Sequence, residues 1–235
     1  MKSTENLLIE GLPKGIAKRF LALCEPFELV LSTELSVRGT QLSHAYFPRS
    51  GFISLVIDID SHPPLEVGMV GRESMLGSEL VLGMAKTPWR ALVQGAGHCW
   101  RIEADVLRQA MVDMPALERV LQRSLMIRLH QQSLASACER FHPIGPRLAR
   151  WLLMSQDRAD ADHFHVTQEF MSLMLGVRRV GVTQAASELQ KDGLIRYTRG
   201  ELAVLDRAGL ERKACTCYEA DKLLHSTLMA AKTSV

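Results

Sequence analysis

The stretch that most constrains the fold runs from Val166 to Leu205, because glycines divide it into short segments of different periodicity. Thr167 can cap a helix, since its side-chain oxygen can accept a backbone N–H of the first turn. Gly176 and Gly193 can each end a helix, because glycine adopts the left-handed conformation beyond a helix C-terminus without steric cost. Two strand-like runs follow between residues 195 and 205, joined by a tight turn. This order predicts a winged helix-turn-helix.

The start of the second predicted helix carries polar side chains, at the position where a recognition helix reaches base edges in the major groove. Arginine can donate two parallel hydrogen bonds to guanine, and glutamine can pair in the same way with adenine. We therefore expect four residues to read bases: Arg178, Arg179, Thr183 and Gln184. The alternative is an ordinary helical subdomain whose arginines are only solvated.

Other polar residues of this segment lie where the phosphates of a bound duplex would pass. The expected phosphate contacts are Thr167 and Gln168 at the start of the first helix, Lys191 at the end of the second, and Arg199 in the hairpin turn. Together with the four base-reading candidates, these residues predict binding to double-stranded DNA.

Three runs of this segment resemble the DNA-binding domain of the cyclic-AMP receptor protein and fumarate-nitrate regulator (Crp/Fnr) family: 167–170 (TQEF), 174–179 (MLGVRR) and 189–195 (LQKDGLI). The resemblance places Arg178 on the base-contacting arginine of the family. Arg179 stands where glutamate is common, and Thr183 replaces a later base-contacting arginine, so the preferred DNA sequence differs. The resemblance implies an α+β fold: an N-terminal cyclic-nucleotide-binding-like β-roll, a long dimerisation helix and a C-terminal winged helix-turn-helix.

The N-terminal half is expected to be rich in short strands. Apolar and polar residues alternate around Val56 and Asp58, which is the period of a strand with one solvated face. Similar runs at close spacing favour a β-roll or sandwich. The expected strands are Glu28–Leu31, Ala45–Phe47, Phe52–Ile59, Leu65–Val70, Ala91–Gln94 and His98–Ile102.

The run from Arg38 to Leu55 also resembles the effector domain of the family, and Glu79 and Arg90 fall near its ribose-binding glutamate and phosphate-binding arginine. They form a candidate effector pocket. Ser78 displaces the glutamate within its turn, and Ala91 lacks the hydroxyl that follows the arginine in the family. We therefore expect no cofactor, with a cyclic nucleotide as the disfavoured alternative.

Residues 114–142 form a long helical pattern that contains no glycine or proline from 116 to 142. Apolar residues recur on two different faces, so the helix must be covered twice. One face can pack on its own β-roll and the other on the same helix of a second copy. The expected dimer residues are Leu117, Val120, Leu121, Ile127 and Leu134. The predicted domains are residues 1–113, 114–142 and 143–235.

The five cysteines predict free thiols and no metal site. Cys215 and Cys217 form a CxC pair with no second cysteine pair nearby, whereas zinc needs four ligands within reach. Only Cys24 lies in the region where the fumarate-nitrate branch of the family carries cluster-binding cysteines. His163 and His165 are placed in a polar loop. Residues 142–146 (HPIGP) are the expected hinge after the long helix, because two prolines and a glycine interrupt it, and His142 is a single histidine there.

Composition limits the classes of function. The net charge of +2 does not itself argue for nucleic acid, and no run approaches the ~18–20 apolar residues of a membrane span. No catalytic triad, P-loop or acid–base pair is evident, so we predict no enzyme. The leading hypothesis is a cytoplasmic homodimeric transcription regulator that binds a pseudo-palindromic operator, with RNA polymerase as a further partner. The alternative is a small-molecule sensor whose helix-turn-helix docks a protein.

Overall fold

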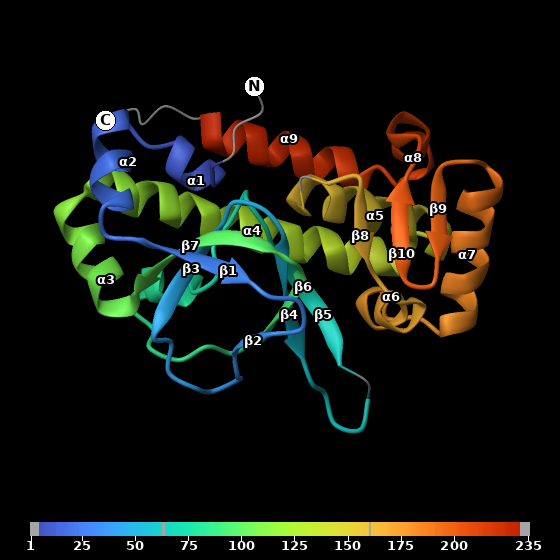
Figure 1. The fold of residues 1–235 in the computed structure, drawn as a ribbon, viewed down its shortest axis with the longest axis horizontal. Helices are drawn as coiled ribbons and strands as arrows, with labels where there is room; N and C mark the ends of the chain where they lie inside the picture. The colour runs from blue at the N-terminus through green and yellow to red at the C-terminus, as the bar shows by residue number, and fades with distance from the viewer. Residues whose placement is uncertain (1–4, 63, 160, 231–235) are drawn as a thin grey trace.

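The computed structural model describes residues 5–62, 64–159 and 161–230. A β-rich N-terminal half and a C-terminal half of small helices and strands lie at opposite ends of the molecule (Figure 1). The long helix α4 (Pro115–Phe141) runs between them. Helix α9 (Cys217–Ala230) turns back from the C-terminal half and packs along α4. The fold class predicted from the sequence is confirmed.

The described strands of the N-terminal half form two antiparallel sheets, with the orders β1-β7-β3 and β2-β6-β4-β5. The buried side chains of Leu29, Ile53 and Val93 belong to one apolar cluster between them. All six expected strands are present, Leu65–Val70 with the expected ends and the other five with changed ends, and β2 is additional. The strands are β1 (Glu25–Leu29), β2 (Glu34–Ser36), β3 (His44–Pro48), β4 (Phe52–Ile57), β5 (Leu65–Val70), β6 (Arg90–Gly95) and β7 (Gly97–Glu103).

A second apolar cluster joins this β-roll to the helices around it, and it contains Phe20, Phe47, Leu107 and Leu121. The proline of α4 lies in its first turn, where the missing N–H has no helical partner to lose. The helices that flank the sheets are α1 (Leu7–Glu10), α2 (Lys14–Leu21) and α3 (Ala104–Asp113), with the short 3-10 helix η1 (Ser78–Leu82).

Helix α4 differs from the sequence-based prediction in which residues it leaves uncovered. Leu117, Leu121 and Ile127 are buried within the chain. Val120 packs on the cluster of the β-roll, and Leu134 packs on a cluster of cysteines. Leu117, Leu121 and Ile127 are therefore not available for a dimer seam, because the chain itself covers them. Val120 and Leu134 are only partly covered, and their place in a seam stays a prediction. Met126 and Leu129 remain exposed, at 56% and 59%.

The C-terminal half is built on α5 (Ile144–Ala159), which is separated from the end of α4 only by residues 142 and 143. Its first turn contains Pro146, so the helix begins inside the expected hinge of 142–146. His163 and His165 lie in a strand that pairs with β10, not in a loop. The remaining elements are β8 (His163–His165), α6 (Gln168–Leu175), α7 (Arg179–Lys191), β9 (Ile195–Thr198), β10 (Glu201–Val204) and α8 (Arg207–Lys213).

No helix in the described part of the chain is both long enough and apolar enough to pass through a lipid bilayer.

Candidate nucleic-acid interface

Helices α6 and α7 form the predicted helix-turn-helix, and local capping explains their ends. The Oγ1 of Thr167 accepts the backbone N–H of Phe170 at 3.1 Å, so it caps α6 as expected. Gly176 follows α6 with a φ of 61°, which is the left-handed conformation that favours glycine. The backbone of Gly181 passes so close to Ile144 that a Cβ would lie 2.7 Å from its Cδ1. Helix α7 therefore packs tightly on the start of α5.

Helix α7 separates a buried face from an exposed one, as the sequence predicts. Val182, Ala185, Ala186 and Leu189 are buried. The four base-reading candidates, Arg178, Arg179, Thr183 and Gln184, are all exposed. Arg178 is the N-cap residue and Arg179 is the first residue of the helix.

Val180 is a residue of this exposed end that sequence reasoning did not single out, and 78% of it is exposed. The signal was available in the sequence, because Val180 follows the two arginines and lies off the apolar stripe of α7.

Two of the predicted contact residues bond to each other across the helix crossing. The Thr183 hydroxyl donates to Oε1 of Gln168 at 2.8 Å. This bond orients both side chains on the exposed side of α6 and α7. Gln184 is oriented differently, since its Nε2 donates to Glu188 of the same helix at 3.3 Å.

A surface hollow lies at the N-terminus of α6, and its lining includes Thr167, Gln168, Arg179 and Arg199. Two guanidinium-bearing side chains thus line the end of a helix whose first N–H groups are positive in character, which suits an oxygen anion. Arg199 has a φ of 53° and Gly200 one of 88°. These values make the two-residue turn between β9 and β10 that brings Arg199 to the hollow.

Lys191, the fourth phosphate candidate, is the last residue of α7 and is exposed. It lies at the opposite end of that helix from Arg178. The predicted phosphate contacts therefore fall into two groups, one at the hollow and one at the far end of α7.

Residues 146–213 match the family model of the Crp-like helix-turn-helix domain. Over a larger part of the chain, FixK2 from Bradyrhizobium japonicum has a TM-score of 0.69 at 14% identity, covering 82% of this chain and 98% of its own. The c-di-GMP-responsive global regulator CLP from Xanthomonas campestris has a TM-score of 0.65 at 19% identity, with 82% and 99% covered. A CRP-family transcriptional regulator from Thermus thermophilus has a TM-score of 0.64 at 22% sequence identity. The match covers 81% of this chain and 96% of that regulator. No curated protein sequence matches the chain.

Residues 146–213 form a Crp-like helix-turn-helix domain. The domain match identifies a DNA-binding transcription regulator, and regulators of this family are not enzymes. The structural likenesses, all at identities below 25%, add that the fold extends through the β-roll and α4.

The two residues of the candidate effector pocket have different partners. Glu79 is buried in η1, and its Oε1 accepts the Thr87 hydroxyl at 2.9 Å. Arg90 lies beside Glu34 and Asp58, with N–O distances of 3.8 and 3.9 Å. Glu79 and Arg90 thus have separate partners in the free chain, and a shared effector pocket stays a prediction.

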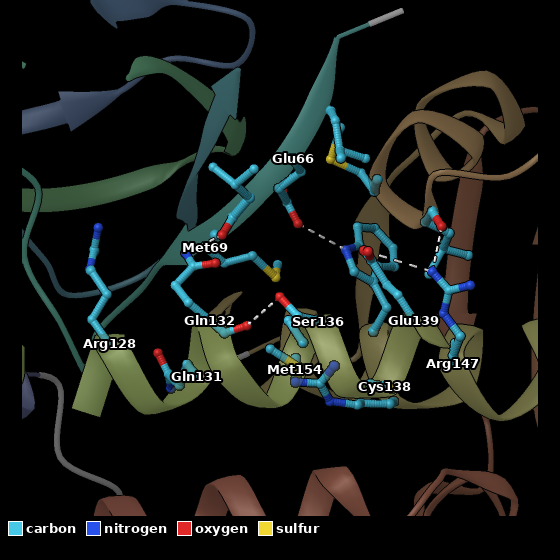
Figure 2. Close-up of a pocket in the computed structure, with 18 of the residues that line it drawn as sticks. Glu66, Met69, Arg128, Gln131, Gln132, Ser136, Cys138, Glu139, Arg147 and Met154 are labelled. Carbon is cyan, nitrogen blue, oxygen red and sulfur yellow. Dashed lines mark hydrogen bonds and ion pairs between the residues drawn. The ribbon is translucent and has the colours of Figure 1, made fainter. Parts of the chain in front are cut away.

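A cavity of about 270 Å³ lies instead where the β-roll meets the DNA-binding half of the regulator (Figure 2). It is lined by β5, α4, α5 and the end of α6. Glu66 of β5 accepts hydrogen bonds from Ser54 and from the indole N–H of Trp151 in α5, the latter at 3.3 Å. Burial raises the pKa of the Glu66 carboxyl to about 7, although both bonds and the charge of Arg158 oppose this shift. Glu66 is thus a titratable group at the junction of the two halves.

We expect the ionisation of Glu66 to lower the stability of the wild-type protein as the pH rises from about 4.5 to about 7. The folded state keeps the Glu66 proton over that window, whereas the unfolded chain releases it near its ordinary pKa of 4.5. Glu66→Gln has no such proton, so its stability should lack this contribution, on the order of 1–3 kcal/mol. Urea midpoints of both proteins at pH 5 and pH 8 measure the difference. Equal pH dependence of the two proteins would refute the assignment.

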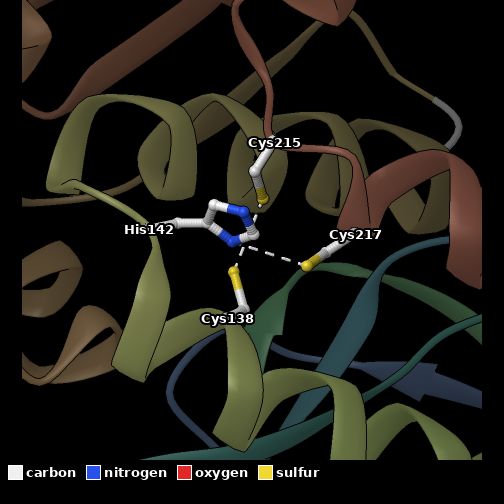
Figure 3. A group of neighbouring side chains, drawn as sticks. All are labelled: Cys138, His142, Cys215 and Cys217. Carbon is white, nitrogen blue, oxygen red and sulfur yellow. Dashed lines mark hydrogen bonds between the residues drawn. The ribbon is translucent and has the colours of Figure 1, made fainter.

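A side-chain cluster that sequence reasoning missed lies at the bend between α4 and α5 (Figure 3). Cys215 and Cys217, for which no second pair was evident in the sequence, have Cys138 and His142 beside them. The premise that Cys215 and Cys217 lack further ligands is therefore wrong. The available signal was the pair Cys138-x3-His142 at the end of α4, since residues four apart share one face of a helix.

Proposed function

We propose that the chain acts as a homodimeric transcription regulator in the cytoplasm, with α7 inserted into the major groove of a pseudo-palindromic operator. The observation that carries the proposal is the exposed start of α7. Among the described residues, no hydrogen bond or ion pair engages the guanidinium groups of Arg178 and Arg199. Side chains that remain solvated in the free protein are available for bases and phosphates.

Residue roles follow from position on this surface. Arg178 and Arg179 are the proposed base readers, and Val180 beside them offers an apolar contact for a thymine methyl group. Thr183 and Gln184 lie one turn further along. Thr167, Gln168 and Arg199 would hold a phosphate at the hollow, while Lys191 would hold a second phosphate at the end of α7.

A second copy is proposed to pack on the stripe of α4 that the chain itself leaves uncovered. Seven exposed residues of α4 recur at alternating intervals of three and four, which is the spacing of a two-helix seam. The stripe consists of Arg119, Gln122, Met126, Leu129, Ser133, Ser136 and Arg140. Two copies related by two-fold symmetry would present their α7 helices to half-sites about 34 Å apart.

The effector signal is proposed to pass from the β-roll through α4 to the bend at α5. Both the cavity and the Glu66–Trp151 bond lie at this junction, so a change there would re-aim α7 relative to the seam. An effector shifts the balance only through its different affinity for the two arrangements. RNA polymerase is a further proposed partner.

Selection of bound sequences from a random DNA pool, with and without cyclic AMP, tests the proposal. We expect enrichment of sequences with two inverted half-sites separated by about one helical turn. No enrichment in either condition, together with stable capture of a protein partner through α7, would favour the alternative of a sensor that docks protein. The arm with cyclic AMP tests whether a cyclic nucleotide is an effector.

Lys191→Ala is expected to weaken binding to every DNA sequence alike, because a phosphate contact carries no base information. The slope of log affinity against log salt concentration should become shallower by about 1. Titration of specific and random duplexes at several salt concentrations measures both effects. Lys222→Ala on α9, which removes a lysine that pairs with Glu219, is the matched control and should change neither. A loss confined to one base position would contradict the phosphate role.

A further inference from the structure

Four potential metal ligands converge at the bend between α4 and α5. Cys138 lies in the last turns of α4, and His142 directly follows that helix. Cys215 lies in the link between α8 and α9, and Cys217 is the first residue of α9. The Sγ atoms of Cys138 and Cys215 are 3.5 Å apart, and the Sγ of Cys217 is 3.6 Å from Nδ1 of His142. All four ligand atoms lie within 4.8 Å of one another, with the side chains pointing inward from different elements (Figure 3).

The distances of 3.5 and 3.6 Å are those of the edges of a small tetrahedron, and the widest separation, at most 4.8 Å, would have to shorten by up to about 1 Å. With zinc–sulfur bonds of about 2.3 Å and zinc–nitrogen bonds of about 2.0–2.1 Å, neighbouring ligand atoms lie roughly 3.5–3.8 Å apart. A single ion at the centre therefore needs little movement of the side chains. Three cysteines and one histidine form an established ligand set for structural zinc, and they leave no open position for catalysis. An iron–sulfur cluster is a poorer fit, because it is usually held by four cysteines.

The surroundings suit an anionic metal–thiolate centre. The three cysteines are nearly fully buried, at 1%, 7% and 6% exposure for Cys138, Cys215 and Cys217. A zinc ion with three thiolates and a neutral imidazole carries a charge of about −1. The guanidinium of Arg150, itself 9% exposed, is close enough for its positive charge to act on all three cysteines. Its Nε has no hydrogen-bond partner among the described residues, so its charge is free to offset the centre.

We propose that Cys138, His142, Cys215 and Cys217 bind one zinc ion. The ion would tie the last turn of α4 to the start of α9, beside the first turn of α5, where the backbone N–H of Cys215 donates to the Pro146 carbonyl at 3.4 Å. It would thereby fix the bend that orients the DNA-binding half against α4. Because thiols must lose their protons to bind, affinity for the ion falls as the pH is lowered.

Metal analysis of the full chain, purified under reducing conditions with zinc present, tests the proposal. We expect about one zinc per wild-type chain and almost none in Cys217→Ser or His142→Ala. Cys24→Ser is the matched control, because this thiol lies in the N-terminal half and donates to the Phe20 carbonyl. Cys24→Ser should retain the wild-type zinc content. Equal zinc in wild type and Cys217→Ser, or none in wild type, would overturn the site.

Cobalt replacement of the wild-type ion keeps the test independent of whether the variants fold. We expect the intense visible bands of tetrahedral Co²⁺ and thiolate-to-cobalt charge transfer in the near ultraviolet, both lost when zinc is added. Removal of zinc by a chelator should lower the Tm by roughly 5–10 °C, and added zinc should restore it. Weak octahedral cobalt bands, acid-labile sulfide, or a Cys138–Cys215 disulfide in the reduced preparation would overturn the proposal. None of these measurements depends on DNA binding.

Discussion

Replacement of Arg178 or Arg179 by alanine, one at a time, is expected to lower operator affinity by about 5- to 150-fold. This range corresponds to the roughly 1–3 kcal/mol that a bidentate arginine–guanine contact contributes. Both side chains are exposed at the start of α7, so the substitutions remove no packing within the folded chain. Neither variant should therefore lose thermal stability. Competition binding with every single-base change in the half-site measures the effect, which should be a relaxed preference at one base pair per half-site.

Arg212→Ala is the matched control for these variants. Arg212 is 73% exposed in its side chain and lies on α8, outside the helix-turn-helix, where it faces Asp206 at 3.8 Å. The control removes the same charge from the same domain, so it separates base reading from general attraction to DNA. If Arg212→Ala lost as much affinity as Arg178→Ala and Arg179→Ala, with base preference intact in all three, the arginines would not be base readers.

The helix-turn-helix could be predicted from the sequence because its ends are set by local chemistry. Thr167 and Gly176 each act within a few residues of their own position, as a cap and as a left-handed terminator. The hairpin turn at Arg199 and Gly200 is equally local. Such signals do not depend on distant parts of the chain. The exposed face of α7 then follows, since its apolar stripe must turn toward the first helix.

The covered and uncovered faces of α4 could not be assigned in this way. The periodicity of Leu117, Leu121 and Ile127 shows that two faces are apolar, but not what covers each of them. The cover of one face is α9, whose residues lie about a hundred positions away in the sequence. The sequence-based prediction therefore assigned to a second copy a stripe of α4 that the chain's own helix α9 already covers. The same long-range packing brings Cys138 and Cys215 together across 77 positions.

Helix α9 contacts both α4 and α5, so it restrains the bend between these two helices. Tyr218 near its start is almost fully buried, and its hydroxyl donates to Asp157 of α5 at 2.8 Å. Gln131 of α4 donates to Asp221 of α9 at 3.4 Å. One helix therefore contacts both sides of the bend. A change at the Glu66 junction must work against these contacts before it can re-aim α7, and the proposed zinc site lies at the same point.

Leu129→Glu is expected to convert the proposed dimer to a monomer and to reduce operator affinity by more than about 100-fold. Leu129 is 59% exposed in the single chain, so the folded protomer should tolerate a carboxylate there. In a pair of α4 helices the two carboxylates would meet near the two-fold axis, and burying unpaired like charges costs several kcal/mol. A monomer would also lose the gain in affinity from engaging two linked half-sites.

Sedimentation equilibrium and gel-shift titration of the same preparations check both parts of the Leu129→Glu prediction. Val30→Glu is the matched control, because Val30 is an apolar residue with 54% exposure that lies after β1 and outside α4. We expect Val30→Glu to remain dimeric and to bind the operator as wild type does. A dimeric Leu129→Glu with unchanged affinity would show that two copies do not meet along this stripe. A monomeric Leu129→Glu with wild-type affinity would instead show that a single α7 is sufficient for binding. That result would contradict the proposal that two copies bind an inverted pair of half-sites.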